Sequence, residues 1–227
     1  MQCSKYFLFL ITKKVTTVAK IVTFANVKGG TGKSTLCINV AAMLVKLNYK
    51  VCVIDADRQK STLDWITNTS DAVLSQVACN EISNLAEISE LNYEFVLVDT
   101  QGSLNKELSL VLGMSSLVLV PCRVSRDDIV GQGWIQMFLE RSQKGEHDTP
   151  MLAVLNGVNK RSSILSHIKQ QLNDDGTDVA RTTISQRVCF SETNVNKRSV
   201  IGYNQTAESE IAELTSEILT ILDNGRQ

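Results

Sequence analysis

Short runs of consecutive apolar residues, many of them β-branched, recur along the chain and are separated by longer segments of mixed polarity. We expect a strand at each run, over residues 21–25, 51–54, 95–98, 117–120 and 151–155. A strand that is apolar at nearly every position is typical of a sheet covered on both faces. The runs therefore predict a central sheet that lies inside the protein.

The longer segments carry apolar residues at every third or fourth position, which is the spacing of an amphipathic helix. We expect helices over residues 34–47, 106–112, 129–143, 162–172 and 207–222. This alternation predicts an α/β fold with a twisted, mostly parallel sheet that is flanked by helices on both faces. Ligands bind such sheets at the carboxyl ends of the strands, so the functional residues are expected there.

Composition and charge limit the classes of protein that fit. Of the 227 residues, 43% are apolar and 21% charged, which suits a globular protein and not a disordered one. Because the chain has 23 basic and 24 acidic residues, its net charge is −1. That balance excludes a globally basic nucleic-acid binder but leaves room for a local basic patch.

The beginning of the chain differs from the rest. No linker marks a domain boundary after Thr17, so we expect one domain over residues 20–227 and an N-terminal extension over residues 1–19. The apolar run at residues 6–11 is too short to span a bilayer or to form a signal-peptide core. An irregular extension is the simplest interpretation, while an interaction strand and a misassigned start site remain open.

Cysteine and histidine usage bears on metal chemistry. The six cysteines form no C-x-x-C pair, and the histidines are His147 and His167. This pattern argues against a zinc site or an iron–sulfur cluster. Scattered cysteines with apolar neighbours fit reduced thiols in a cytosol.

A glycine-rich segment directly follows the first expected strand and opens the first expected helix. It consists of Lys28, Gly29, Gly30, Thr31, Gly32, Lys33, Ser34 and Thr35. Glycines let successive backbone N–H groups point at one anion, and the helix presents its positive N-terminus to the same place. Lys33 is expected to reach the β- and γ-phosphates of a nucleotide, and the Ser34 hydroxyl to hold Mg²⁺. The segment therefore predicts a P-loop NTPase, although Val27 stands where the strict pattern has its first glycine.

Val27 and the extra lysine, Lys28, resemble the deviant Walker A group of ATPases, which includes ParA-type partition proteins, MinD-type division regulators and the nitrogenase iron protein. The resemblance covers residues 20–222 and implies ATP as the nucleotide. It also implies that Lys28 reaches across a dimer interface to the partner's nucleotide. Such a role is physically reasonable, because a second cation can neutralise charge on the transferred phosphoryl group.

Acidic residues follow two further expected strands. Asp55 and Asp57 end one strand, and Asp99 ends another. The first pair resembles the family's D-x-D-P-Q switch, with Arg58 in place of the proline. By that resemblance Asp57 orients or activates the attacking water, Asp55 lies near the water shell of the metal, and Asp99 holds Mg²⁺ through water. Gly102 would permit a hinge as the γ-phosphate comes and goes.

Recognition of the base depends on weaker signals. The segment 159–162 echoes the N-K-x-D guanine motif, but Ser162 lacks the carboxylate that would accept the two donors of guanine. Adenine is therefore favoured. In the family an asparagine after the corresponding strand contacts the base, and Asn156 matches it; a plain turn is the open alternative.

Several features separate the branches of the family. The iron protein would need cluster cysteines. The last expected helix carries Glu208, Glu210, Glu213 and Glu217, which anionic lipid would repel, so no stable membrane association is expected. Segments 183–188 and 207–211, and Leu119-Val120-Pro121 with Ser125 and Asp128, resemble small plasmid partition ATPases that lack an N-terminal helix-turn-helix domain.

That resemblance implies a slow, partner-stimulated ATPase that is cytoplasmic and nucleoid-associated. It implies an ATP-dependent homodimer, non-specific binding of double-stranded DNA, and a ParB-like or other adaptor protein on the cargo. Two alternatives stay open: a P-loop metabolic or regulatory ATPase, and a MinD-like membrane-cycling positioning ATPase.

Non-specific DNA binding requires clustered cations. The candidates lie in the C-terminal third of the chain: Lys160, Arg161, Lys169, Arg181, Arg187, Lys197 and Arg198. A solvated charged surface is the alternative for each of them. Lys197 and Arg198 replace a glycine-containing turn that is usual in the family.

Overall fold

The computed structural model describes residues 19–81, 87–88, 91–124, 126–143 and 149–224. The expectations for residues 1–18, Ser125 and His147 lie outside these ranges. The strands are β1 (Lys20–Phe24), β2 (Val51–Ala56), β3 (Ala78–Asn80), β4 (Phe95–Thr100), β5 (Leu117–Cys122), β6 (Met151–Val158), β7 (Asp178–Val179) and β8 (Ile184–Ser185). They form a sheet in the order β3-β2-β4-β1-β5-β6-β7, with β8 paired to β6, and each of these pairs is parallel.

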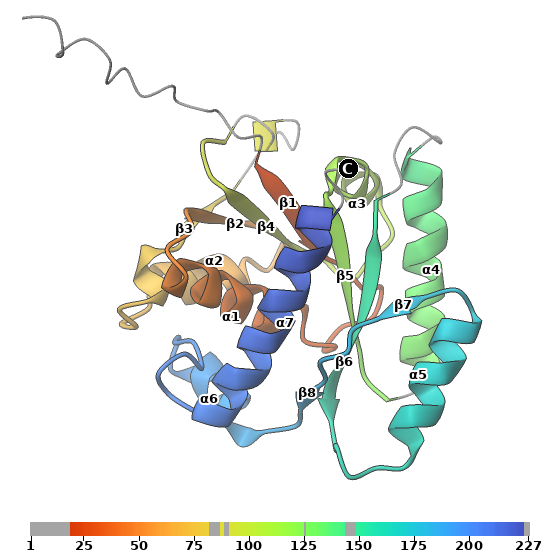
Figure 1. Cartoon of the computed structure of the whole chain (residues 1–227). Coiled ribbons are helices and arrows are strands. Elements are labelled where there is room, and N and C mark those ends of the chain that lie inside the picture. Colours follow the sequence, from red (N-terminus) through yellow and green to blue (C-terminus); the bar gives the residue numbers. More distant parts are fainter. Residues whose placement is uncertain (1–18, 82–86, 89–90, 125, 144–148, 225–227) are drawn as a thin grey trace, which may run out of the picture.

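Helices cover both faces of the sheet (Figure 1). They are α1 (Lys33–Lys46), α2 (Ser61–Thr67), α3 (Lys106–Met114), α4 (Arg126–Gln143), α5 (Ile164–Asp174), α6 (Val188–Val195) and α7 (Gln205–Asn224). α1 and α7 pack together on one face, whereas α4 and α5 lie on the other side of β5 and β6 (Figure 1). The α/β fold with a mostly parallel sheet and helices on both faces is thus confirmed.

Alternate residues of the central strands face the two layers, because side chains alternate along a strand. In β5, Leu117 and Leu119 belong to the apolar cluster beneath α1 and α7, while Val118 and Val120 join the cluster beneath α4 and α5. Both faces of this strand are therefore buried, as its continuous apolar sequence predicts.

Six of the elements that the structure describes were not predicted: β3, β7, β8, α2, α6 and a 3₁₀ helix, η1 (Leu74–Gln76). β7 and β8 have two residues each, too few for a periodic pattern. The α2 helix has seven residues, and α6 has no clear apolar stripe, since its valines Val188 and Val195 are 73% and 79% exposed. These short pieces matter because α2, α6 and β8 surround the site described below.

Buried polar contacts hold the start of α7 against the rest of the fold. Asn39 of α1 accepts a hydrogen bond from the backbone N–H of Val200 at 2.8 Å. Asp71 accepts from both the backbone N–H and the hydroxyl of Ser199, at 2.9 and 2.7 Å. The segment between α6 and α7 is thereby tied to the same layer as α1. None of the described helices is long and apolar enough to cross a bilayer.

Candidate nucleotide-binding site

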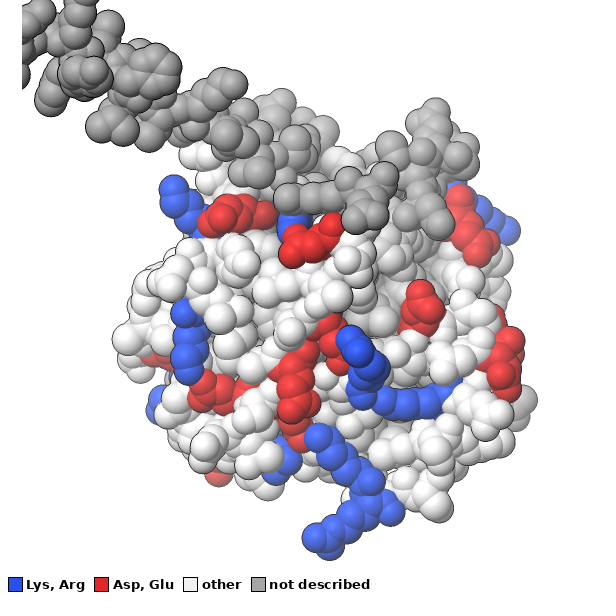
Figure 2. Space-filling view, in the orientation of Figure 1, with Lys and Arg blue, Asp and Glu red and all other residues white. Residues whose placement is uncertain are grey.

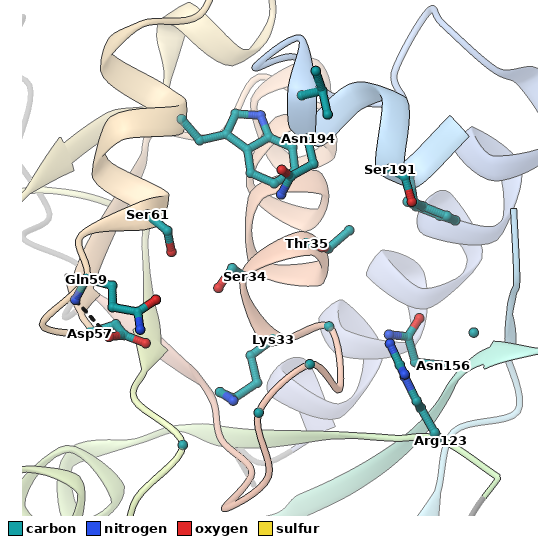
Figure 3. Close-up of a pocket in the computed structure, with 18 of the residues that line it drawn as sticks. Lys33, Ser34, Thr35, Asp57, Gln59, Ser61, Arg123, Asn156, Ser191 and Asn194 are labelled. Carbon is teal, nitrogen blue, oxygen red and sulfur yellow. Dashed lines mark hydrogen bonds between the residues drawn. The ribbon is translucent and has the colours of Figure 1, made fainter. Parts of the chain in front are cut away.

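A cleft of about 890 Å³ opens at the carboxyl ends of the central strands, over the first turn of α1. Asp57 and Gln59 lie on one side of it, and Asn156 and Arg123 on the other (Figure 3). Ser191 and Asn194 of α6 project into it from a third side (Figure 3). The parallel sheet thus has its cleft at the edge that the topology predicts.

The glycine-rich segment forms the floor of this cleft. Gly30 and Gly32 have φ angles of 75° and 99°, the left-handed region that glycine adopts without strain. α1 begins directly afterwards with no side-chain cap and no acidic residue in its first turn. Its first N–H groups and its positive dipole end are therefore suited to an anion such as a phosphate.

Lys33 is held over this floor. Its side chain is buried, and its ammonium donates to the backbone carbonyl of Lys28 at 3.2 Å. Burial lowers the pKa of Lys33, while the nearby charges of Asp99 and Asp57 oppose that shift. Among the described residues this neutral carbonyl is the one hydrogen-bond partner of the desolvated ammonium, which therefore has much to gain from contact with a phosphate.

Asn156 lies directly against the glycine-rich segment, although 125 residues separate it from Thr31. Its side-chain amide donates to the carbonyl of Thr31 at 2.7 Å. A Cβ atom on Gly32 would stand only 2.1 Å from Asn156 Nδ2, so glycine is required there by space as well as by φ. Since the amide nitrogen faces the loop, the oxygen is the group left to accept a donor such as the amino group of adenine.

Asp99 is buried behind the glycine-rich segment. One carboxylate oxygen accepts from the hydroxyl of Thr62 at 2.7 Å, and the other is buried with no partner among the described residues. Burial raises the pKa of Asp99 to about 6, despite opposing interactions with Ser34, Thr62 and Lys33. An unpaired buried carboxylate oxygen is a costly feature unless a cation or its water completes it.

These residues fit Mg²⁺. In the described ranges, no three His, Cys, Asp or Glu side chains gather as a metal cage. Mg²⁺ does not need one, because it keeps several waters and is commonly held by one or two protein oxygens together with substrate phosphates. The unpaired oxygen of Asp99 and the Ser34 hydroxyl, which lies near that carboxylate, are the protein groups that could serve.

Asp55 and Asp57 occupy different places. Both oxygens of buried Asp55 accept backbone N–H groups, from Asp57 at 3.0 Å and Leu63 at 2.8 Å. Asp55 thus orders the loop between β2 and α2. Asp57 lines the cleft, half-buried, and accepts the N–H of Gln59 at 2.9 Å (Figure 3).

Lys28 and Gly102 lie at the margin of the site. A Cβ on Gly102 would come within 3.3 Å of the Val27 carbonyl, so the chain just after β4 packs closely against the backbone that precedes the glycines. Lys28 lines a neighbouring cavity of about 500 Å³, together with Arg123 and Asn159. Arg123 borders both this cavity and the main cleft.

Several of the basic residues predicted to contact DNA have partners within the protein. Lys160 and Arg187 both contact the buried carboxylate of Glu210, at 2.8 and 3.1 Å. Lys197 pairs with Asp64 at 2.9 Å. Such pairs reduce the positive charge that a surface offers to DNA.

The remaining candidates differ in their surroundings. Lys169 donates to the carbonyls of Ala180 and Arg181, and Arg198 lies over the ring of Tyr203 with 4.5 Å between guanidinium and ring centre. Arg161 and Arg181 have exposed side chains. In Figure 2, basic and acidic side chains alternate on the face that carries α7, and no continuous basic patch covers it.

Other cleft residues gave no interpretable signal in the sequence. α2 contributes Ser61 and Trp65, β8 and the residue after it contribute Ser185 and Gln186, and α6 contributes Ser191. The elements that carry them are too short to be found by periodicity. The one available signal is segment 183–188, which resembles a family segment but carries no indication that it borders the nucleotide.

The sheet, the glycine-rich loop at the end of its central strand and the helix that starts from that loop define a P-loop nucleotide-binding protein. Residues 22–200 match the family described as the CobQ/CobB/MinD/ParA nucleotide binding domain. The chain belongs to this family of P-loop NTPases.

Individual relatives agree with this assignment. The chain is 27% identical over 205 residues to the maintenance of carboxysome distribution protein A of Halothiobacillus neapolitanus, a match that covers 86% of this chain and 94% of that protein. It is 25% identical over 179 residues to the protein ParA of Rhizobium radiobacter, covering 75% and 80%. Among solved structures, a plasmid partition protein of Borrelia burgdorferi B31 bound to AMPPNP superposes with a TM-score of 0.71 at 20% identity, covering 89% of this chain and 99% of that one.

Proposed function

We propose that the protein binds ATP with Mg²⁺, hydrolyses it slowly to ADP and phosphate, and uses the nucleotide state to partition or position a cargo. The observation that carries this proposal is the floor of the cleft: the left-handed glycines, the uncapped start of α1 and the buried ammonium of Lys33 converge on one anion site. Relatives named for carboxysome distribution, for ParA and for plasmid partition support the cargo class.

In this proposal each residue of the cleft has a separate catalytic role. Lys33 and the N–H groups of the loop hold the β- and γ-phosphates, and the Ser34 hydroxyl and Asp99 hold the hydrated cation. Mg²⁺, when bound, supplies charge neutralisation between the β- and γ-phosphates. Asp57, which faces the cleft from the other side, orients the attacking water. Asp55 acts on Asp57, because it accepts the backbone N–H of that residue.

In this proposal the bound nucleotide controls whether the protein forms a dimer. We infer that residues 20–227 form one domain that dimerises on ATP, and that Lys28 then reaches the partner's nucleotide. Its place beside Arg123, in a cavity next to the main cleft, supports an action outside its own site. Residues 1–19 are an extension to this domain.

The ATP-bound dimer binds double-stranded DNA without sequence preference, and an adaptor protein on the cargo stimulates hydrolysis. The protein then works in the cytoplasm on the nucleoid, with no stable membrane association. Arg161 and Arg181 are both exposed, the latter with its guanidinium 4.0 Å from Glu217, and they carry the largest share of DNA binding in this proposal.

Two measurements on the full chain test the proposal. Filter binding of a duplex of arbitrary sequence is expected to be tight with Mg-ATP and weak with Mg-ADP, and to weaken steeply with salt. Light scattering is expected to find dimers with Mg-ATP that Lys28→Ala abolishes while ATP binding persists. Equal DNA affinity in both nucleotide states would refute the switch and favour a metabolic P-loop enzyme, and sedimentation with anionic vesicles on ATP would favour a membrane-cycling protein.

A further inference from the structure

One wall of the cleft consists of two strand ends with little support from the sheet itself. Asn156 and Gly157 lie near the end of β6, just before Val158, while Ser185 ends β8 and Gln186 and Arg187 follow it. The pairing of β6 with β8 is irregular between Asn156 and Val158, and β8 has only two residues. A wall this short needs another structure to hold it in place.

Glu210 of α7 supplies that support from behind the wall. Its carboxylate accepts the backbone N–H of Ser185 at 3.0 Å and the hydroxyl of Ser185 at 2.7 Å. It also receives the guanidinium of Arg187 at 3.1 Å and the ammonium of Lys160 at 2.8 Å. Only 4% of the Glu210 side chain is exposed, so a buried carboxylate joins α7, β8 and the turn after β6.

We expect the nucleoside part of a bound nucleotide to lie against this wall of the cleft. The loop that carries Asp57 occupies the opposite side of the cleft, where the terminal phosphate is expected (Figure 3). The wall instead presents the amide of Asn156 and polar groups of β8. It also holds Arg187, whose guanidinium donates to Glu210 and whose buried Nε has no partner among the described residues.

We propose that Glu210 is a positioning residue for the base and ribose of the bound nucleotide, because it fixes Ser185 and Arg187 against Asn156. This inference rests on the proposed ATP binding and adds to it a residue, far from the phosphate loop in sequence, that governs nucleoside affinity and selectivity. The partners of Glu210 are Ser185, Arg187 and Lys160, and none of these is a residue proposed to hold the phosphates or Mg²⁺.

The four groups around Glu210 explain why a neutral substitute fails. All of them are donors: one backbone N–H, one hydroxyl and two cations. The amide group of Glu210→Gln has one acceptor oxygen in place of two and no charge to match the two cations, and the Ser185 hydroxyl is the one neighbour among these four that could turn to accept from its NH₂ group. The substitution therefore loosens the wall without changing the size of the side chain.

The same helix offers a matched control. Glu217, two turns further along α7, accepts the backbone N–H groups of Arg181 and Thr182 and the hydroxyl of Thr182. Its side chain is 13% exposed, and it holds the segment before β8 rather than the cleft wall. Glu217→Gln thus makes the same chemical change in a similar setting away from the cleft.

The test compares binding of Mg-ATP and of Mg-tripolyphosphate, which lacks a nucleoside, by calorimetry on the full chain. For Glu210→Gln we expect ATP affinity to fall about tenfold while tripolyphosphate affinity stays within about twofold, so that the ratio of the two changes. We also expect the preference for ATP over GTP to shrink. Glu217→Gln is expected to lower the unfolding midpoint and to leave both ratios unchanged.

Each other result overturns the inference. If Glu210→Gln lowers the affinities for ATP and tripolyphosphate by the same factor, or changes neither affinity, the residue has only a structural role. If it does not fold, Ser185→Ala decides: it keeps the carboxylate, removes one donor, and is expected to weaken ATP but not tripolyphosphate. If the wild-type protein binds tripolyphosphate but not ATP, the wall is not a nucleoside site; if it binds neither, the proposed ATPase function itself fails.

Discussion

The contact between Gly32 and Asn156 allows a quantitative test of how the phosphate loop is built. Gly32→Ala would place a Cβ atom 2.1 Å from Asn156 Nδ2 and 3.3 Å from its Cγ, at a residue whose φ is 99°. Two separate costs follow. The backbone must hold alanine in a conformation that L-residues avoid, and Asn156 must swing away and give up its hydrogen bond to the carbonyl of Thr31.

Each cost has a typical size. A non-glycine residue in the left-handed region costs about 1–2 kcal/mol. Loss of one hydrogen bond of this kind costs about 1 kcal/mol. Gly32→Ala should therefore destabilise the protein by about 2–3 kcal/mol, and Asn156→Ala by about 1 kcal/mol. In the double variant the hydrogen bond is lost only once, so its cost should be about 1 kcal/mol smaller than the sum of the two single costs.

Urea denaturation without nucleotide, followed by circular dichroism, measures the four free energies of unfolding. Gly29→Ala in the same loop is the control, because a Cβ there would meet nothing within 4 Å and its φ is not positive. That variant should stay within about 0.5 kcal/mol of the wild type. Additivity of the two substitutions within about 0.3 kcal/mol would refute the contact between Asn156 and the loop.

Three further outcomes are expected. Thr62→Val removes a hydroxyl donor that lowers the pKa of Asp99, which burial already raises to about 6. The pKa of Asp99 should therefore rise, the rate of phosphate release should fall, and the pH below which that rate declines should move upward. Burial of Glu210 opposes its ionisation, but Lys160, Ser185 and Arg187 outweigh burial and lower its pKa to about 2. A lowered carboxyl pKa stabilises the fold above the unfolded value of 4.5 and loses that effect as pH falls toward 2, so the stability advantage of wild type over Glu210→Gln should shrink between about pH 5 and pH 2 in urea titrations. Gly102→Val should push on the Val27 carbonyl, 3.3 Å from the new Cβ, and weaken Mg-ATP about tenfold in calorimetry with little change in the free energy of unfolding.

The sheet was predictable because buried parallel strands carry a local signature. Each run of apolar residues became a strand within one to three residues of its expected bounds, as in β5, which extends the run 117–120 to Cys122. The glycine-rich loop was predictable for a similar reason, since its residues are consecutive. Asn156 was found through resemblance, and its contact with the base stays a prediction; its hydrogen bond to Thr31 could not be foreseen.

Contacts between distant segments could not be read from local patterns. Nothing near Lys160 or Arg187 in the sequence indicates that both share the carboxylate of Glu210, because that residue arrives on α7 only when the fold is complete. Asp55 shows the same difficulty. It was expected near the metal's water shell, and its two oxygens are found on backbone N–H groups, one of them from Leu63 in a helix too short to predict.

α2 connects the catalytic loop to the C-terminal part of the protein. At its start, Leu63 donates to Asp55, and Thr62 donates to Asp99. On the side of the helix that faces the C-terminal segment, the indole of Trp65 donates to the carbonyl of Arg198 at 3.3 Å. The helix is therefore attached to Asp55 and Asp99 at its beginning and to the segment after α6 along its length.

The turn at Lys197 strengthens this link at some cost to the backbone. Lys197 has a φ of 49°, a conformation for which glycine is usually used at the end of a helix. Its ammonium pairs with Asp64 of α2, and its carbonyl accepts the hydroxyl of Thr69 just beyond that helix. Because α6 lines the cleft through Ser191 and Asn194, a shift of the loop that carries Asp57 must either move this turn or break these contacts. The short elements that escape sequence analysis thus form the mechanical connection between the phosphate end of the cleft and its outer wall.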